Sequence, residues 1–212
     1  MANEKSRNSI LKLVQLTMLT VLVIVLQTIG TGIKIGPLPL SLVLVPIVLG
    51  ACLLGAKSGA FRGFVFGLIT MIMGITGADA FSFLLFDAAP VAFIVLCLLK
   101  ATLAGLGSGL IYSLLGKLFH GKKVLLQTIL ASVAAPIINT GVFVIGMLLC
   151  FFNTVESLPT LFPDAFGGFA TPYALVFLGL AGLNFVGEFV VNLILSPAMV
   201  TILDVIKKKL HV

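Results

Sequence analysis

Residues 124–152 read V-L-L-Q-T-I-L-A-S-V-A-A-P-I-I-N-T-G-V-F-V-I-G-M-L-L-C-F-F, with Gln127 and Asn139 as the only strongly polar side chains. A run of this length and apolarity can cross the hydrocarbon core of a bilayer as one helix. Asn139 then lies far from either water layer, where an unsatisfied amide costs several kcal/mol, roughly. Three interpretations stay open: Asn139 bonds a neighbouring helix, borders a solute site, or belongs to a kink at Pro136.

The composition extends this interpretation to the whole chain. Of 212 residues, 60% are hydrophobic and 9% are charged, which excludes an ordinary soluble domain. We expect an all-α membrane protein: a compact bundle of six transmembrane helices forming one membrane-embedded domain over residues 1–212. The length leaves no room for a soluble nucleotide-binding domain. The net charge of +6 is better explained by membrane orientation than by nucleic acid, which we do not expect as a partner.

Apolar runs and helix breakers place the six predicted helices. The basic N-terminal residues and the long apolar run after them, with no A-x-A cleavage site, predict a retained first helix. Glycines at 59, 63 and 67, and small residues at 101, 105 and 109, form two stripes that allow close helix approach. Residues 74–89 and 153–170 are predicted to be long folded loops. The expected helices are residues 10–29, 41–54, 58–73, 90–118, 124–152 and 171–209.

Basic residues predict the orientation of this bundle. Eleven of the 13 Lys and Arg residues fall on one side, together with both termini. The other side receives Lys34 and four acidic residues, while Lys100 lies inside a helix. The positive-inside rule therefore predicts that both termini are cytoplasmic.

The three cysteines, Cys52, Cys97 and Cys150, occur singly in apolar runs. We expect them to be small buried side chains, with neither disulfides nor metal implied. The residues imply no cofactor.

Three stretches carry a resemblance to a known family: P-I-V-L-G-A-C-L-L-G-A-K-S-G-A-F-R-G-F-V-F-G (46–67), K-A-T-L-A-G-L-G-S-G-L-I-Y (100–112) and P-I-I-N-T-G-V-F (136–143). The chain resembles the S components of energy-coupling factor (ECF) transporters, most closely the pantothenate-type members. The resemblance implies a multi-pass protein of the bacterial plasma membrane that binds a vitamin on the outer side. It also implies docking to a transmembrane coupling protein and two ATPase subunits.

One departure concerns docking. Family members often carry an A-x-x-x-A pair on the first helix, and Thr17 and Val21 stand at the corresponding positions. The resemblance still makes Thr17 and Val21 candidates for contact with the coupling protein, and the stripe residues Gly63 and Gly105 are further candidates.

The resemblance places the vitamin site in the outer half, and polar residues there supply candidates. Asn139 and Asn184 are expected at a similar depth in the membrane, where their amides can bind a solute, and Thr140 can contribute a hydroxyl group. Lys100 is a candidate for a substrate carboxylate, although pairing with Glu188 explains it equally well. Further candidates are Lys34, Asp87 and Phe81. Asp79 is interpreted as a cap or turn residue. The resemblance favours pantothenate, and these groups are compatible with it, while the 17 phenylalanines keep riboflavin or another vitamin open.

Two other classes of function are less favoured. A self-contained secondary transporter or channel is the alternative, but no internal repeat supports it. An enzyme is disfavoured because no nucleophile–base pair or carboxylate cluster is present. No G-x-x-x-x-G-K-[ST] loop occurs in the sequence, so any ATP hydrolysis is expected from partner ATPases.

Overall fold

The fold is described from a computed structural model of the chain. It describes residues 2–30, 34–35, 38–39 and 42–210. The side chains of residues 2–5, 8, 34–35, 38–39, 183 and 207–210 lie outside that description. Apart from one antiparallel pair of two-residue strands, the regular structure within these ranges is helical. The all-α prediction is confirmed.

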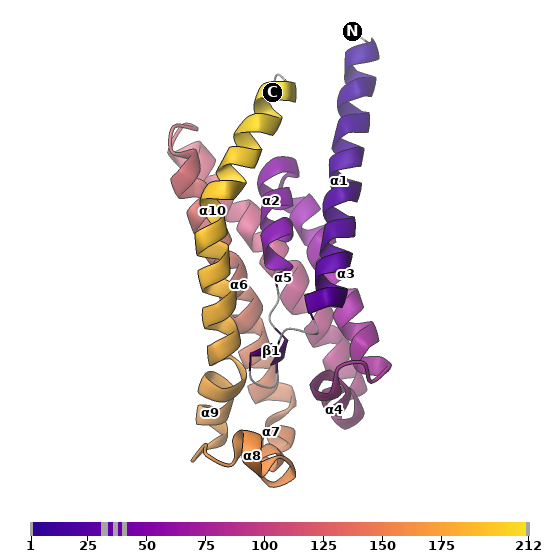
Figure 1. Cartoon of the computed structure of the whole chain (residues 1–212), viewed down its shortest axis with the longest axis vertical. Coiled ribbons are helices and arrows are strands. Elements are labelled where there is room, and N and C mark those ends of the chain that lie inside the picture. The colour runs from indigo at the N-terminus through magenta and orange to yellow at the C-terminus, as the bar shows by residue number, and fades with distance from the viewer. Residues whose placement is uncertain (1, 31–33, 36–37, 40–41, 211–212) are drawn as a thin grey trace.

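The elements follow one another with short connections (Figure 1). They are α1 (Ala2–Gly30), β1 (Lys34–Ile35), β2 (Leu38–Pro39), α2 (Leu44–Leu54), α3 (Ala56–Ile75), α4 (Ala80–Ala88), α5 (Pro90–Leu118), α6 (Val124–Cys150), α7 (Phe152–Leu161), α8 (Pro163–Phe166), α9 (Pro172–Ala174), the π-helix η1 (Leu175–Leu180) and α10 (Gly182–Leu210).

Within the described residues, five helical segments are long and apolar enough to cross a membrane. They correspond to α1, α3, α5, α6 and the continuous stretch from α9 through α10. The sixth predicted helix is α2, which is apolar but has only 11 residues. Since a typical span needs about 20 residues, α2 is a short helix buried among the long ones: eight of its residues are buried.

The two segments predicted as loops contain helices, and this part of the prediction is wrong. Residues 80–88 form α4, which begins where the Asp79 side chain accepts a hydrogen bond from the Ser82 backbone N–H. Such a cap satisfies an exposed N–H and fixes the start of a helix. Residues 152–166 form α7 and α8, and their apolar side chains, including Val155, Leu158 and Phe166, are buried in the core.

The small-residue stripes pack against each other along α3 and α5. A Cβ at Gly63 would meet the backbone of Ala101, and one at Gly105 would meet the backbone of Gly59. A Cβ at Gly67 would lie 2.6 Å from the Cys97 carbonyl oxygen. The predicted close approach is confirmed: these two helices touch backbone to backbone, which only hydrogen-sized or methyl-sized side chains permit.

Buried side chains form three clusters along the bundle. One joins α4, α5, α6, α7, α8 and η1 at the end away from the termini. The other two join α1, α2, α3 and α5, and α2, α6 and α10. Cys52 and Cys97 are buried in these clusters, as predicted, whereas Cys150 is exposed at the end of α6 and that prediction is wrong.

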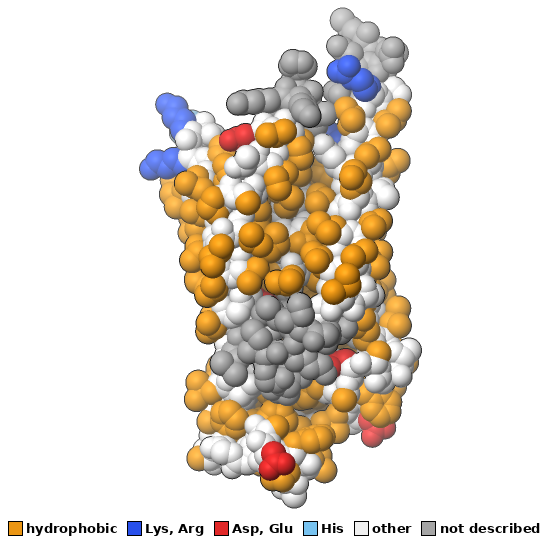
Figure 2. All heavy atoms as spheres, in the orientation of Figure 1, with side chains coloured by type: hydrophobic (Ala, Val, Ile, Leu, Met, Phe, Trp, Pro, Cys, Tyr) orange, Lys and Arg blue, Asp and Glu red, His pale blue; other side chains and the backbone are white. Residues whose placement is uncertain are grey.

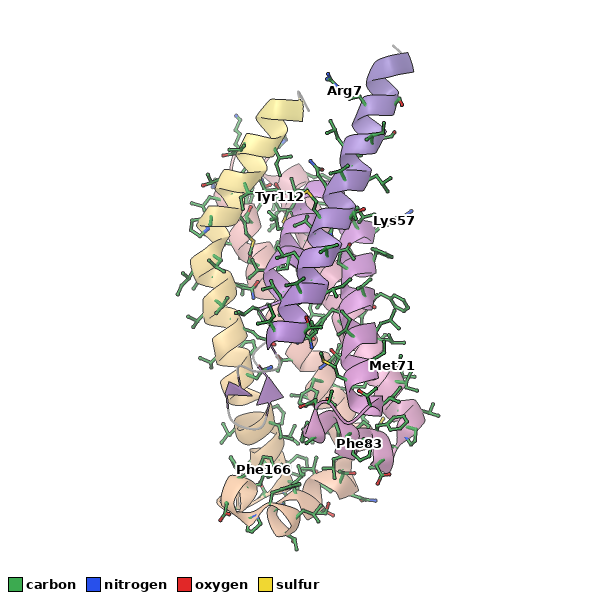
Figure 3. All side chains as sticks on the ribbon, turned by 45° about the vertical axis from the view of Figure 1, so that its right-hand side comes forward. Arg7, Lys57, Met71, Phe83, Tyr112 and Phe166 are labelled. Carbon is green, nitrogen blue, oxygen red and sulfur yellow. The ribbon has the colours of Figure 1, made fainter. Side chains whose placement is uncertain are left out.

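The two ends of the bundle differ in charge. The start of α1 and the end of α10 lie at the same end (Figure 1). Figure 2 shows Lys and Arg side chains at that end, a wide belt of hydrophobic side chains in the middle, and acidic side chains mostly at the opposite end. In Figure 3, Arg7 and Lys57 lie toward the terminal end, while Phe83 and Phe166 lie at the other. The exposed apolar belt is the surface expected of a protein surrounded by lipid.

Candidate functional site

A cavity lies in the half of the bundle remote from the termini, beneath the α4–α8 end. Its walls come from α1, α3, α4, α5, α6, η1 and α10. The volume is about 70 Å³, room for a few water molecules. A larger solute therefore requires its wall side chains to move. The polar residues that line it are Gln27, Thr70, Asp79, Ser82, Lys100, Asn139, Thr140 and Asn184.

Glu188, of which 1% is exposed, accepts hydrogen bonds from one asparagine of α6 and one of α10 in the wall between these two helices. Asn139 donates from Nδ2 to Glu188 Oε2 at 3.4 Å, and Asn184 donates from Nδ2 to Oε1 at 3.1 Å. Asn192, one turn further along α10, donates to the Glu188 backbone carbonyl at 2.8 Å. The interpretation that Asn139 bonds a neighbouring helix is confirmed. The same residue lines a cavity, and a solute site there stays a prediction.

Both cavity asparagines keep one polar atom unused. Asn139 Oδ1 and Asn184 Oδ1 are buried and have no hydrogen-bond partner among the described residues. Asn139 lies 11 residues before the end of α6, or about 17 Å along the axis at 1.5 Å per residue. An orphaned carbonyl at such depth is costly. A polar solute in the cavity would satisfy it.

Lys100 brings a cation to the part of the wall formed by α5. It lies 10 residues into α5, about 15 Å from the helix start, and its Nζ is 5.2 Å from the centroid of the Phe143 ring. A cation over an aromatic face is stabilised by the ring quadrupole. The side chain is half-buried and lines the cavity. Binding to a substrate carboxylate and pairing with Glu188 both stay predictions.

The remaining polar wall comes from α1, α3 and α4. Gln27 donates from Nε2 to Thr70 Oγ1 at 3.4 Å, and Thr70 in turn donates to the Phe66 carbonyl at 3.1 Å. Asp79 acts as the cap of α4, as predicted, and also faces the cavity. Gln27, Thr70 and Ser82 were missed by the sequence reasoning. Gln27 carried a signal, since it is a strongly polar residue in the first apolar run.

The π-helix η1 shapes the edge of this site. Its last residue, Leu180, and the following Ala181 line the cavity just before Asn184. A π-turn widens the helix and shifts the direction of the side chains after it. Gly179 within η1 makes room for the ring of Phe169, because a Cβ there would lie 2.8 Å from that ring.

The structure brings together most of the predicted substrate residues: Asn139, Thr140, Asn184, Lys100 and Phe81 line one cavity. Asp87 is exposed on α4 and is not among the lining residues. Lys34 lies on β1, and its side chain is outside the described part of the chain.

The predicted docking residues fall into two groups. Thr17 and Val21 are exposed on α1, where Thr17 also donates to the Leu13 carbonyl. Gly63 and Gly105 are enclosed between α3 and α5, so helix packing accounts for them. A docking role for any of the four stays a prediction.

Comparison with known proteins gives one match. The family described as ECF transporter, substrate-specific component, matches residues 11–200. None of the curated proteins and none of the solved structures matches the chain. The family match covers the five long apolar spans except the first two residues of the Ser9–Gly30 span and the end of the Pro172–Ile206 span. It also covers every residue of the cavity wall. This multi-pass membrane protein belongs to the family of ECF transporter substrate-specific components.

Proposed function

We propose that the chain is the S component of an ECF-type importer in a bacterial plasma membrane, and that it binds a vitamin from the outer side, pantothenate being the first candidate. The observation that carries this proposal is the cavity, which is lined by Lys100 and by two asparagines with orphaned amide oxygens. The family match supports the same role. In this proposal α2 counts as the sixth helix and both termini are cytoplasmic.

Pantothenate fits the polar groups of the cavity. Its carboxylate matches the ammonium group of Lys100, and its amide and hydroxyl groups match Asn139, Thr140 and Asn184. Riboflavin stays a second candidate because four phenylalanines, Phe66, Phe81, Phe93 and Phe143, also line the cavity. Aromatic rings stack on such walls.

Energy for uptake comes from partners in this proposal. A transmembrane coupling protein and two ATPase subunits bind the membrane-embedded S component, with α1 as the first candidate for contact. The exposed apolar face of α1, which includes Met18 and Val21, leaves it accessible from the lipid phase.

Two measurements test the proposal. Mass spectrometry of the protein purified in mild detergent should detect a bound vitamin, and added pantothenate should raise the melting temperature more than riboflavin does. Affinity purification from native membranes should bring down two ATPases and one coupling protein. Uptake by the chain alone in proteoliposomes, without these partners, would contradict the proposal and favour a self-contained transporter.

A further inference from the structure

Glu188 determines which atoms the α6–α10 wall offers to a solute. It is almost fully buried and is not among the residues that line the cavity. Each of its two carboxylate oxygens accepts a hydrogen bond from a different asparagine, Asn139 or Asn184. The carboxylate thus lies behind the wall and holds the two amides that form it.

This arrangement fixes the orientation of both amides. An ionised carboxylate only accepts hydrogen bonds, and an amide donates only through its nitrogen. Both asparagines turn their NH₂ groups toward Glu188, which leaves their carbonyl oxygens for other partners. Those oxygens are the two buried atoms without a partner among the described residues.

We propose that Glu188 is a positioning residue for specificity: it makes the amides of Asn139 and Asn184 present their acceptor oxygens, not their donors, to the cavity, and these oxygens select solutes with hydroxyl or N–H donors. A carboxylate or carbonyl group at this wall would face two oxygens of like polarity and be rejected. The proposal rests on the proposed function and adds to it the chemical class and direction of the bound solute.

The α5 wall has the complementary polarity. Lys100 offers donors and a positive charge there, where its Nζ lies over the ring of Phe143 on α6. A bound solute is therefore oriented with its anionic end toward α5 and its hydroxyl or N–H end between α6 and α10. Pantothenate has a carboxylate at one end and two hydroxyls at the other, so it satisfies this order in one direction only.

The test compares two probes on the full-length protein: pantothenate and its analogue with both hydroxyls replaced by hydrogen. For the unaltered protein, we expect the analogue to bind about ten- to a hundredfold more weakly, the usual effect of leaving a buried polar group unpaired. In Asn184→Leu this difference should shrink to about threefold or less, because one acceptor is gone. In Glu188→Gln it should also shrink, because a glutamine can donate and lets one amide turn over.

Asn192→Leu provides the matched control. Asn192 is a buried asparagine on the same helix and bonds the Glu188 backbone, but it does not line the cavity. This variant should keep the full discrimination between the probes even if its melting temperature falls. If Glu188→Gln does not fold, the comparison of Asn184→Leu with Asn192→Leu decides alone. Equal discrimination in those two variants would overturn the proposal.

A second probe pair separates this inference from the identity of the vitamin. Riboflavin and lumichrome differ by the ribityl chain, which carries the hydroxyl donors, while both keep the N3–H of the ring. If pantothenate fails to bind but riboflavin is discriminated from lumichrome through Asn184, the acceptor wall stands and the pantothenate assignment falls. If neither donor-bearing vitamin binds the unaltered protein, the acceptor wall and the proposed vitamin uptake both fall.

Discussion

Lys100 is the one cationic side chain among the described residues that line the cavity, and we expect it to discriminate among solutes by charge. Its Nζ lies over the Phe143 ring at 5.2 Å from the centroid, inside a wall that is otherwise largely apolar. In such surroundings an ammonium group favours an anionic partner far more than it would in water. A methionine at this position keeps the length of the side chain and removes the charge.

We predict that Lys100→Met abolishes the preference for a carboxylate. The unaltered protein should bind pantothenate about tenfold or more tightly than pantothenol, in which an alcohol replaces the carboxylate, because hydrogen bonds to charged groups contribute about 1.5–3 kcal/mol. The variant should bind the two equally. Calorimetry with both compounds measures this, and unchanged preference in Lys100→Met would remove Lys100 from the site.

Among single residues, the sequence identified residues that line the cavity where their depth in an apolar run singled them out. Asn139 and Lys100 stood out because a strongly polar group inside an apolar run is costly without a partner. Gln27 carried the same signal. Thr70 and Ser82 gave no such signal in the sequence. Hydroxyl side chains commonly donate to a carbonyl of their own helix, as Thr70 does to the Phe66 carbonyl. Only the approach of other helices places these residues at a cavity.

At the scale of elements, the contact between α3 and α5 sets how closely the cavity walls approach. A Cβ added at Gly105 would meet the backbone of Gly59, whereas one added at Gly141 on α6 would have no described atom within 4 Å beyond its own helix backbone and chain neighbours. Both glycines lie within helices, so replacement by alanine gives each the same intrinsic gain of about 1 kcal/mol in helix propensity. The difference between the two variants therefore reports helix contact.

We predict that Gly105→Ala lowers the melting temperature of the protein in detergent, while Gly141→Ala leaves it unchanged or raises it. The added methyl group at position 105 must push the two backbones apart, and overpacking of this kind costs about 1–3 kcal/mol. Gly63→Ala, which meets the Ala101 backbone, should behave like Gly105→Ala. Equal melting temperatures for positions 105 and 141 would contradict the observed packing.

The helix α4 depends on its cap in a similarly testable way. Asp79 accepts from the Ser82 N–H at 3.0 Å, and loss of such a cap costs about 1 kcal/mol. Asp79→Ala should speed amide hydrogen exchange across α4, because its first turn opens more often. Asp79→Asn keeps an acceptor oxygen and should exchange like the unaltered protein. Fast exchange in both variants would mean that the charge, not the cap, orders this helix.

The sequence predicted helices well where a long apolar run was the main signal. It predicted them poorly where helix-breaking residues lay among apolar ones. The long apolar runs gave α5 with its observed bounds, 90–118, and α6 to within two residues. In residues 74–89 and 153–170, Gly, Pro and Asp favoured loops, but the apolar side chains between them gain more by packing as helices. Phe166, of which 3% is exposed, shows which tendency prevailed. The π-turn of η1 has no sequence signature of this kind.

On the scale of the whole molecule, the described basic residues that the sequence assigns to the end with the termini lie there, with the exception of Arg62. Arg62 was counted among the loop charges, but it is fully buried in α3, where its guanidinium lies against Gly50 of α2 and donates to the Ser58 carbonyl at 3.3 Å. It therefore contributes to packing rather than to the charged end. Leaving it out alters the asymmetry little, since Arg7, Lys57 and the lysines around residue 122 remain exposed.

The orientation itself gives the last prediction. Lys122 lies at the turn between α5 and α6, at the end that carries the termini, and Glu156 lies on α7 at the opposite end; both are exposed. With the native cysteines replaced by alanine, Glu156→Cys should react with a membrane-impermeant maleimide in intact cells. Lys122→Cys should react only after lysis, because positive residues are retained on the cytoplasmic side. The reverse pattern would place the half of the bundle that contains the cavity toward the cytoplasm, and this would contradict binding of a solute from the outer side.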